Sequence, residues 1–490
     1  MSLKQKTISG LKWSFADNII NQGIQFIVGI ILARLLSPVE FGLIGMVTFF
    51  LVISQTFIDS GFSQALIRKT DCSQEDYSTV FYFNIILGVL CYALLFLCSN
   101  VIGSFYNEPA LSMIVKIIGI NLIVNSFTIV PKAIITSKID FKLQANISFI
   151  SSVLSGIISI WMALFGWGVW SLVWRTISQN IITALILYIK MQWRPIFVFK
   201  MDSFNKLFSF GSKLLISGII SSTFSNIYLL VIGKYYSAAD LGYYTRADQF
   251  KNFPSQNITS VIQRVSYPVL VTVKDDAVKL KRGYQKLIKN IMFLSIVLMF
   301  GMAVLARPLV TTLIGEKWLP VVPYLQFLCL PGMMYPLHAL NLNILKVKGR
   351  SDLYLWIELL KALLAIPTII IGIFWGIKMM ILGIFVNSII AFIINSYWSS
   401  KLINYSIIEQ LMDIIPSLAI ALIMSIGLLF VGFCFHTVSL LILLFQILIG
   451  GMIVIILSHF IKYKPYIEMY EIIKSTIKND KINLYLNEEK

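Results

Sequence analysis

The residues best suited to chemistry gather in one stretch, 241–265, which reads LGYYTRADQFKNFPSQNITSVIQRV. It carries three cations, one carboxylate and two well-placed amides: Arg246, Lys251, Arg264, Asp248, Gln249 and Gln256. Such groups inside a membrane are costly and usually face a partner or a water-filled cavity. Their net positive charge favours an anionic ligand. The three-residue spacing of Asp248 and Lys251 also allows a structural ion pair, so both interpretations stay open.

A stripe of polar residues occurs twice, 200 positions apart: Asp17, Asn21 and Gln25, and then Ser217, Ser221 and Ser225. Residues four apart share one face of a helix. A polar face turned to lipid would leave hydrogen-bonding groups unsatisfied, so each stripe must face another helix or water. Bonding between helices and the lining of a cavity both fit this pattern. As carboxylates, Asp17 and Asp248 are the candidates for coupling to an ion.

The composition shows which elements must carry these residues. Of 490 residues, 58% are hydrophobic and 13% are charged, whereas soluble domains have about 25% charged residues. The chain is therefore predicted to be an all-α polytopic membrane protein. Its net charge of +17 does not indicate nucleic acid, because the basic residues lie in short loops between apolar segments. No metal-ligand spacing and no ATP-binding loop occurs, so we expect no metal and no cofactor.

A helix needs roughly 20 apolar residues to cross the bilayer, and about fourteen such spans can be placed. They are 12–34, 41–65, 79–102, 111–131, 145–165, 169–189, 212–233, 241–265, 287–306, 321–345, 352–374, 379–399, 413–435 and 438–460. Most of the 40 lysines and arginines fall in alternate loops, on the side that also holds both ends of the chain. The positive-inside rule predicts a multi-pass plasma-membrane protein with both termini in the cytoplasm. The tail at 461–490 is expected to form a short surface helix.

One short motif is written twice. LARLLSPVEFG at 32–42 corresponds to IGKYYSAADLG at 232–242. The pairs that correspond are Arg34 with Lys234, Ser37 with Ser237, Glu40 with Asp240, and Gly42 with Gly242. Six spans separate the copies, so both run in the same direction, as in parallel repeats whose interface commonly holds a transport site. We expect the motif itself to mark helix ends at the water interface.

The stretches FGLIGMVTFFLVISQTFIDSGFSQALIRK (41–69) and LGYYTRADQFKNFP (241–254) resemble the polysaccharide-transporter, or O-antigen flippase, family. That family belongs to the multidrug/oligosaccharidyl-lipid/polysaccharide exporter superfamily, and the similarity extends over about residues 5–460. The resemblance implies two parallel six-helix lobes around a central cavity, lined mainly by spans one, two, seven and eight, with two further C-terminal helices. The predicted division is 1–200, 201–400, 401–460 for the last two spans, and 461–490 for a cytoplasmic tail.

The resemblance also implies a function: transfer of undecaprenyl-pyrophosphate-linked oligosaccharide from the cytoplasmic to the outer leaflet of a bacterial membrane by alternating access. The repeat unit would belong to O-antigen, capsule or exopolysaccharide. Partners would be this lipid-linked oligosaccharide, membrane lipids, a proton or sodium gradient and polysaccharide assembly proteins. In this interpretation the cations of 241–265 hold the anionic group of the substrate.

Two alternative functions fit the sequence less well than the transfer of a lipid-linked oligosaccharide. A drug or organic-cation exporter of the same superfamily would favour acidic cavity residues, and 241–265 carries the opposite charge. A membrane-bound glycan polymerase or ligase would need catalytic groups on long outward loops, and the longest outward loop, about 307–320, is short. The sequence thus favours a transporter over an enzyme.

Overall fold

The computed structural model describes residues 3–69, 71–273, 275–435 and 439–477. Everything regular within those residues is helical, as expected for an all-α membrane protein. The chain forms two compact units, which divide between Arg246 and Ala247. The predicted lobe boundary at residue 200 stays a prediction.

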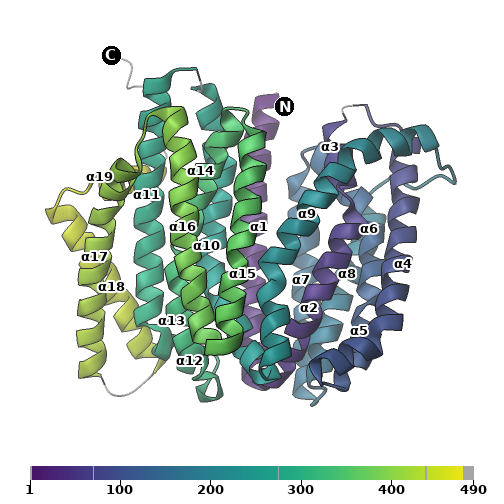
Figure 1. Ribbon diagram of the computed structural model, residues 1–490, viewed down its shortest axis with the longest axis horizontal. Helices are drawn as coiled ribbons and strands as arrows, with labels where there is room; N and C mark the ends of the chain where they lie inside the picture. The colour runs from purple at the N-terminus through teal and green to yellow at the C-terminus, as the bar shows by residue number, and fades with distance from the viewer. Residues whose placement is uncertain (1–2, 70, 274, 436–438, 478–490) are drawn as a thin grey trace. The chain divides into compact units, whose positions relative to one another are not determined.

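The first unit is built from the helices that precede the division (Figure 1). Their bounds are α1 Leu3–Leu35, α2 Pro38–Asp59, α3 Phe62–Arg68, α4 Gln74–Tyr106, α5 Ala110–Ile118, α6 Ile120–Ser137, α7 Phe141–Leu164, α8 Val169–Lys190 and α9 Met201–Tyr235. Helix α1 packs along α7, and α9 packs against α2, α3 and α4.

Helix α10, Ala238–Thr272, contains the point where the units divide. The remaining elements belong to the second unit. Their bounds are α11 Ala277–Val304, α12 Ala306–Leu313, the 3-10 turn η1 Glu316–Trp318, α13 Val321–Gly332, α14 Tyr335–Val347, α15 Ser351–Trp375, α16 Ile377–Ile403, α17 Ile407–Cys434, α18 Leu440–Phe460 and α19 Lys464–Ile477. The principal packed pairs here are α11 with α17 and α15 with α16.

Among the described residues, 12 helices are long and apolar enough to cross a membrane. The two other predicted spans are helical but fail that measure for different reasons. The eighth, 241–265, lies inside α10, whose charged and amide residues lower its hydropathy. The tenth, 321–345, is divided into α13 and α14, each too short to count alone. The predicted fold class is confirmed, with fourteen as an approximate number of spans.

The second predicted span ends earlier than its apolar run. Helix α2 stops at Asp59, because Ser60 and Gly61 take left-handed backbone conformations, with φ of 46° and 70°. A Cβ on Gly61 would lie 2.6 Å from the backbone oxygen of Gly211 in α9. Glycine therefore lets α9 approach the break, and the chain resumes as the short helix α3.

Both copies of the repeated motif serve as helix starts. The Oγ and backbone nitrogen of Ser37 donate to the Glu40 carboxylate at 2.9 and 2.6 Å, at the start of α2. The same two atoms of Ser237 donate to Asp240 at 2.6 and 3.3 Å, at the start of α10. These are reciprocal N-terminal caps, in which a side chain and a backbone group satisfy each other. The expectation that Glu40 marks a helix end is confirmed.

The glycines of the motif bring its two copies together within the first unit. A Cβ on Gly42 would lie 1.7 Å from the carbonyl oxygen of Ala238. A Cβ on Gly242 would lie 2.0 Å from the carbonyl oxygen of Pro38. Pro38 and Ala238 occupy equivalent positions in the repeat, so the contact is reciprocal. Only glycine permits backbones to approach this closely.

Each unit has its own apolar core. In the first, Phe62, Val130 and Leu207 are buried where α3, α4, α6 and α9 meet. In the second, Tyr284 is fully buried among α11, α14 and α17, and its hydroxyl donates to Asn341 at 2.8 Å. These cores hold in position the helices that carry the polar side chains of each unit.

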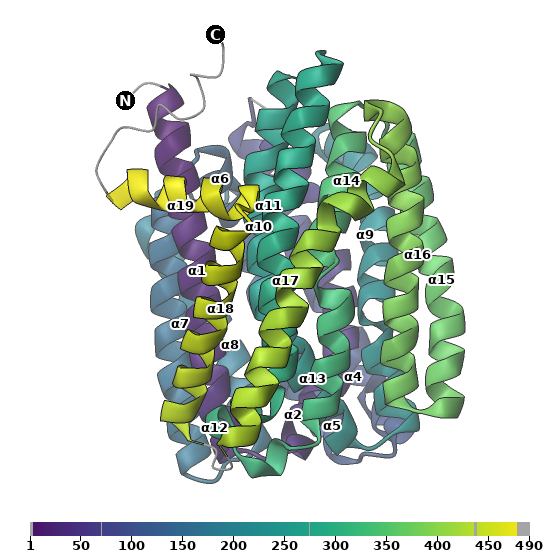
Figure 2. The ribbon, with the colours of Figure 1, turned by 90° about the vertical axis from the view of Figure 1, so that its left-hand side faces the viewer.

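Helix α19 accounts for the described part of the predicted surface helix in the tail. Figure 2 shows it crossing α11 and α18 rather than running along them. Asn290 of α11 donates to the Glu468 carboxylate at 2.8 Å, which fastens α19 to the second unit. Residues 478–490 of the predicted tail lie outside the described residues.

Substituting the contact glycines tests the reciprocal approach. We expect Gly42→Ala and Gly242→Ala each to lower the free energy of unfolding by about 1–3 kcal/mol or more, because the added methyl overlaps a backbone carbonyl. Gly23→Ala on α1 is the matched control, since a Cβ there meets nothing within 4 Å. Chemical unfolding of the purified protein in micelles, followed by tryptophan fluorescence, measures all three. Unchanged stability of Gly42→Ala would contradict the close approach.

Candidate functional site

Arg246 is the cation that the first unit holds most closely. Its side chain is only 8% exposed. The guanidinium lies over the ring of Phe41, 3.6 Å from the ring centroid. Phe41 stands beside Gly42 in α2, and Arg246 follows Gly242 by one turn of α10. The contact between the two motifs thus places the guanidinium on the ring, where the π face compensates part of its lost hydration.

A second guanidinium, that of Arg175 in α8, lies within electrostatic range of Arg246 inside the same unit. The Nη2 atom of Arg175 donates to the backbone oxygen of Gln25 in α1 at 3.3 Å. Two like charges held together inside one unit form a region of positive potential. An anion placed there would be attracted by both guanidinium groups.

The stripe of α1 is tied to α7 and α8. Within α1, Gln25 donates to the side chain of Asn21 at 3.5 Å. Asn21 in turn accepts from the Ser152 hydroxyl of α7 at 2.5 Å. Gln179 of α8 donates to the same hydroxyl at 3.2 Å. At Asn21 the stripe therefore bonds one helix to the next, which is the first of the two roles predicted for it. Asp17, one turn earlier, is partly buried.

Lys251 and Asp248 form the ion pair that their spacing allowed. Lys251 Nζ lies 2.6 Å from Asp248 Oδ1, and the lysine side chain is only 3% exposed. Asn252 donates to the other carboxylate oxygen at 2.6 Å. The stem of Lys251 packs on Gly332, and its ammonium lies 4.9 Å from the ring centroid of Tyr335. The charge of Lys251 is therefore already matched inside the second unit.

The other predicted site residues differ in exposure. Ser221 and Ser225 are exposed on α9, and Gln256 is exposed on α10. Gln249 is partly buried. Arg264 lies in the helical backbone of α10, but its side chain is outside the described residues.

The structure joins some predicted residues into one polar track of the first unit and leaves others apart. Hydrogen bonds join Asn21, Gln25 and Arg175, and Arg246 lies within electrostatic range of Arg175. Arg175 is not among the site residues predicted from the sequence. The signal was its four-residue spacing from Gln179 inside an apolar span, which puts both on one face of α8.

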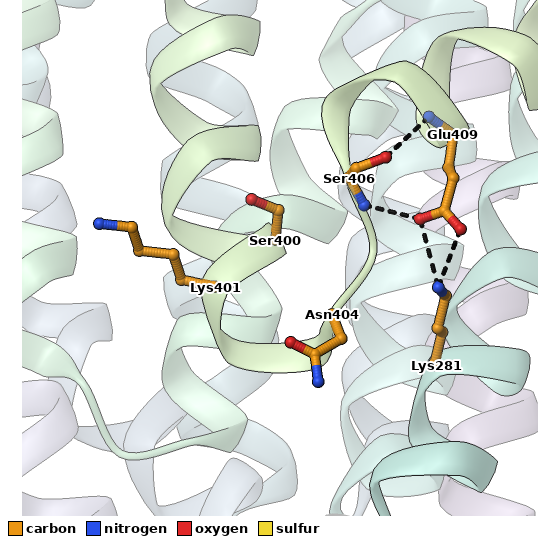
Figure 3. A pocket seen from close by; sticks show the side chains of 6 residues that line it. All are labelled: Lys281, Ser400, Lys401, Asn404, Ser406 and Glu409. Carbon is orange, nitrogen blue, oxygen red and sulfur yellow. Dashed lines mark hydrogen bonds and ion pairs between the residues drawn. The ribbon is translucent and has the colours of Figure 1, made fainter.

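A separate pocket, of about 530 Å³, lies in the second unit at the ends of α16 and α17 (Figure 3). Lys281 Nζ reaches both oxygens of Glu409, at 2.9 and 3.2 Å. Glu409 also accepts from the backbone nitrogen of Ser406 at 2.8 Å and completes a helix cap. The carboxylate and ammonium that form this wall thus satisfy each other, which is a structural role.

Known proteins are similar in sequence to this chain over most of its length. The sequence pattern of a family described as "Polysaccharide biosynthesis protein" matches residues 31–323. The teichuronic acid biosynthesis protein TuaB of Bacillus subtilis is 28% identical over 72% of this chain and 73% of its own length. The succinoglycan biosynthesis transport protein ExoT of Rhizobium meliloti is 25% identical over 74% of this chain and 73% of its own.

A solved structure shares the fold. The lipid II flippase MurJ, in an inward closed conformation, aligns with a TM-score of 0.76 over 94% of this chain and 100% of its own. The sequences are 16% identical, so this likeness establishes the architecture alone. This likeness agrees with the all-α membrane fold expected from the sequence.

The ion pair of α10 gives a test of whether Lys251 is held by Asp248. We expect Asp248→Asn to lower the free energy of unfolding by about 3–5 kcal/mol, because it leaves a buried ammonium without its countercharge. The double variant Asp248→Asn/Lys251→Met should recover part of that loss. Asp202→Asn, at an exposed carboxylate of α9, is the control. If Asp248→Asn unfolds like the unaltered protein, the pair does not support the ammonium.

Proposed function

Because the chain belongs to the polysaccharide biosynthesis protein family, we propose that it transfers a lipid-linked oligosaccharide across the bacterial inner membrane. The observation that carries this proposal is the buried guanidinium of Arg246 on the ring of Phe41, with the guanidinium of Arg175 within electrostatic range. The printed names of TuaB and ExoT concern the making and transport of bacterial polysaccharides. The many apolar helices suit a substrate whose lipid tail stays in the bilayer.

The chemistry of arginine supports an anionic substrate group. A guanidinium presents a planar fork of donors that matches phosphate oxygens in pairs. Charge-assisted bonds of this kind are shorter and stronger than neutral ones. A pyrophosphate joining lipid to sugar would meet Arg246 and Arg175 together, and its charge would offset the repulsion between them. Lys251 contributes less in this scheme, because Asp248 already matches its charge.

Transport follows from exposing that group to each side of the membrane in turn. The two predicted lobes rock against each other, so that the polar head of the substrate crosses through protein while the tail crosses through lipid. Both termini stay in the cytoplasm in this scheme. Enzymes that make and use the lipid-linked saccharide on the two faces are the candidate partners. The chain acts as a transporter, without a catalytic step of its own.

A drug or organic-cation exporter fits the charges less well. A cationic passenger would have to approach two neighbouring guanidinium groups, and the repulsion would grow in a cavity with low-dielectric walls. The buried positive charge of the first unit favours an anion.

Arg246→Ala tests the proposed substrate contact. We expect surface polysaccharide to fall at least tenfold, because a hydrogen bond to a charged group contributes roughly 1.5–3 kcal/mol. Lipid-linked saccharide should accumulate in the cytoplasmic leaflet at the same time. The measurement is surface glycan and lipid-linked saccharide in the native host, with the variant as the sole copy. Arg246→Lys should restore transport in part, since it keeps the charge and loses the fork.

The control is Arg307→Ala, at an exposed arginine of α12. Protein abundance in the membrane has to match in all variants, so that loss of transport is not loss of protein. Normal export by Arg246→Ala at normal abundance would overturn the assignment of Arg246.

Coupling to an ion gradient is tested at Asp17. A partly buried carboxylate on the stripe of α1 can take up a proton or a sodium ion from one side and release it to the other. We expect Asp17→Asn to retain substrate binding but to lose the dependence of transport on the gradient. The measurement is transfer of a fluorescent lipid-linked saccharide in proteoliposomes with and without imposed proton or sodium gradients. Full gradient dependence in Asp17→Asn would refute the role.

A further inference from the structure

A polar pocket of about 450 Å³ lies in the first unit, away from the Arg246 contact. Its walls come from α2, α3, α6 and α9. The polar side chains that line it include Gln55, Asp59, Gln64, Asn125, Thr128 and Lys132. Ligand pockets are typically about 300–1,000 Å³ with a few convergent polar groups. The size and the lining both suit one small hydrophilic unit.

Lys132 supplies the positive charge of this pocket. Its side chain is exposed to the pocket, and its ammonium makes no ion pair with the acidic residues that the structure describes. Asp59 lines the same pocket and yet is not paired with it. A lysine near a helix end can simply extend to the membrane surface. Lys138 and Lys142 lie at the end of α6 and the start of α7, whereas Lys132 lines the pocket.

The other groups are oriented by bonds within the wall. The Asp59 carboxylate accepts from the Ser63 hydroxyl at 2.6 Å and from the Ser63 backbone nitrogen at 3.3 Å. The Asn125 amide oxygen accepts from the Thr128 hydroxyl at 2.8 Å. A carboxylate has two oxygens and about four acceptor positions, so Asp59 keeps capacity for donors from a ligand. The NH₂ group of Asn125 keeps its donors.

These groups select one class of ligand. The ammonium of Lys132 requires an anionic group, and the Asp59 carboxylate requires hydroxyl donors. Inorganic phosphate meets the first requirement, but it lacks the separate array of hydroxyl donors that a sugar ring would place against Asp59. A neutral sugar meets only the second requirement. A sugar that carries a carboxylate meets both.

We propose that the pocket between α2, α3, α6 and α9 is a binding site for an acidic sugar unit of the oligosaccharide. This inference rests on the proposed function. Lys132 holds the sugar carboxylate, Asp59 accepts from its hydroxyls, and Gln64 and Asn125 complete its recognition. The pocket thereby determines which glycans are accepted, whereas Arg246 attracts the group that joins glycan to lipid.

The test is binding of sodium glucuronate to the purified full-length protein in nanodiscs, observed by saturation-transfer NMR. Glucose and inorganic phosphate serve as competitors. We expect glucuronate to bind, Lys132→Gln to weaken its binding at least tenfold, and Asp59→Asn to weaken it several-fold. Lys138→Gln, at an exposed lysine six residues further on, should leave binding within twofold. An excess of glucose or phosphate should displace glucuronate only weakly.

Three results would overturn the proposal: no glucuronate binding, an unchanged affinity in Lys132→Gln, or displacement by phosphate as effective as by glucuronate itself. The last would show a general anion site. Unfolding curves check that each variant is folded. If Lys132→Gln fails that check, Gln64→Ala, at an exposed residue of the pocket wall, replaces it and should weaken binding several-fold.

The failure of this inference and that of the proposed function are distinguishable. Transport of a lipid-linked saccharide with no glucuronate binding would refute the proposed sugar site and would still support the proposed transport function. Glucuronate binding that depends on Lys132, without any transport, would support the proposed sugar site and would refute the proposed transport function.

Discussion

The contact on which the first unit depends is the reciprocal approach of Gly42 to Ala238 and of Gly242 to Pro38. The two copies of one motif meet there with equivalent atoms exchanged. A contact of that kind arises when a duplicated segment packs on its own copy. The contact also shows how the residues of the motif act together. The serine and the acidic residue start each helix, and the glycine lets the two helix starts touch.

The same contact explains where the buried charge lies, because the repeat is not perfectly symmetric. Arg246 in the second copy corresponds to Met46 in the first, and Phe41 in the first corresponds to Leu241 in the second. One copy therefore contributes an aromatic face and the other a cation, and the glycine contact brings them together. A cation at position 41, in place of the aromatic ring, would repel Arg246. The contact between Arg246 and Phe41 therefore needs one residue from each copy.

Much of this could be predicted from the sequence, because apolar runs, charge placement and short-range spacing are local properties. The spans, the cap at Glu40 and the pairing of Lys251 with its neighbour are all recorded within a few residues. The partners of Arg175 and Asn21 could not be predicted, because they depend on which helix lies opposite. Asn21 accepts a hydrogen bond from Ser152, 131 positions away, and hydropathy does not indicate which residues of different helices are neighbours. The pocket at Lys132 could not be predicted for the same reason, since its walls come from four separate helices.

The two polar sites of the first unit stand at opposite ends of one helix. Phe41, which holds Arg246, and Asp59, which lines the Lys132 pocket, are both in α2, and 18 residues at a rise of 1.5 Å each separate them by roughly 27 Å. That is close to the ~30 Å thickness of the hydrocarbon core. A substrate with one acidic sugar and one phosphate-type linkage would have a charged group for each site. Since α2 fixes their spacing, the head group can be recognised at two points without either site changing its own shape. If both proposed sites bind their groups, the distance between the charges of the substrate is a criterion for transport, alongside their chemistry.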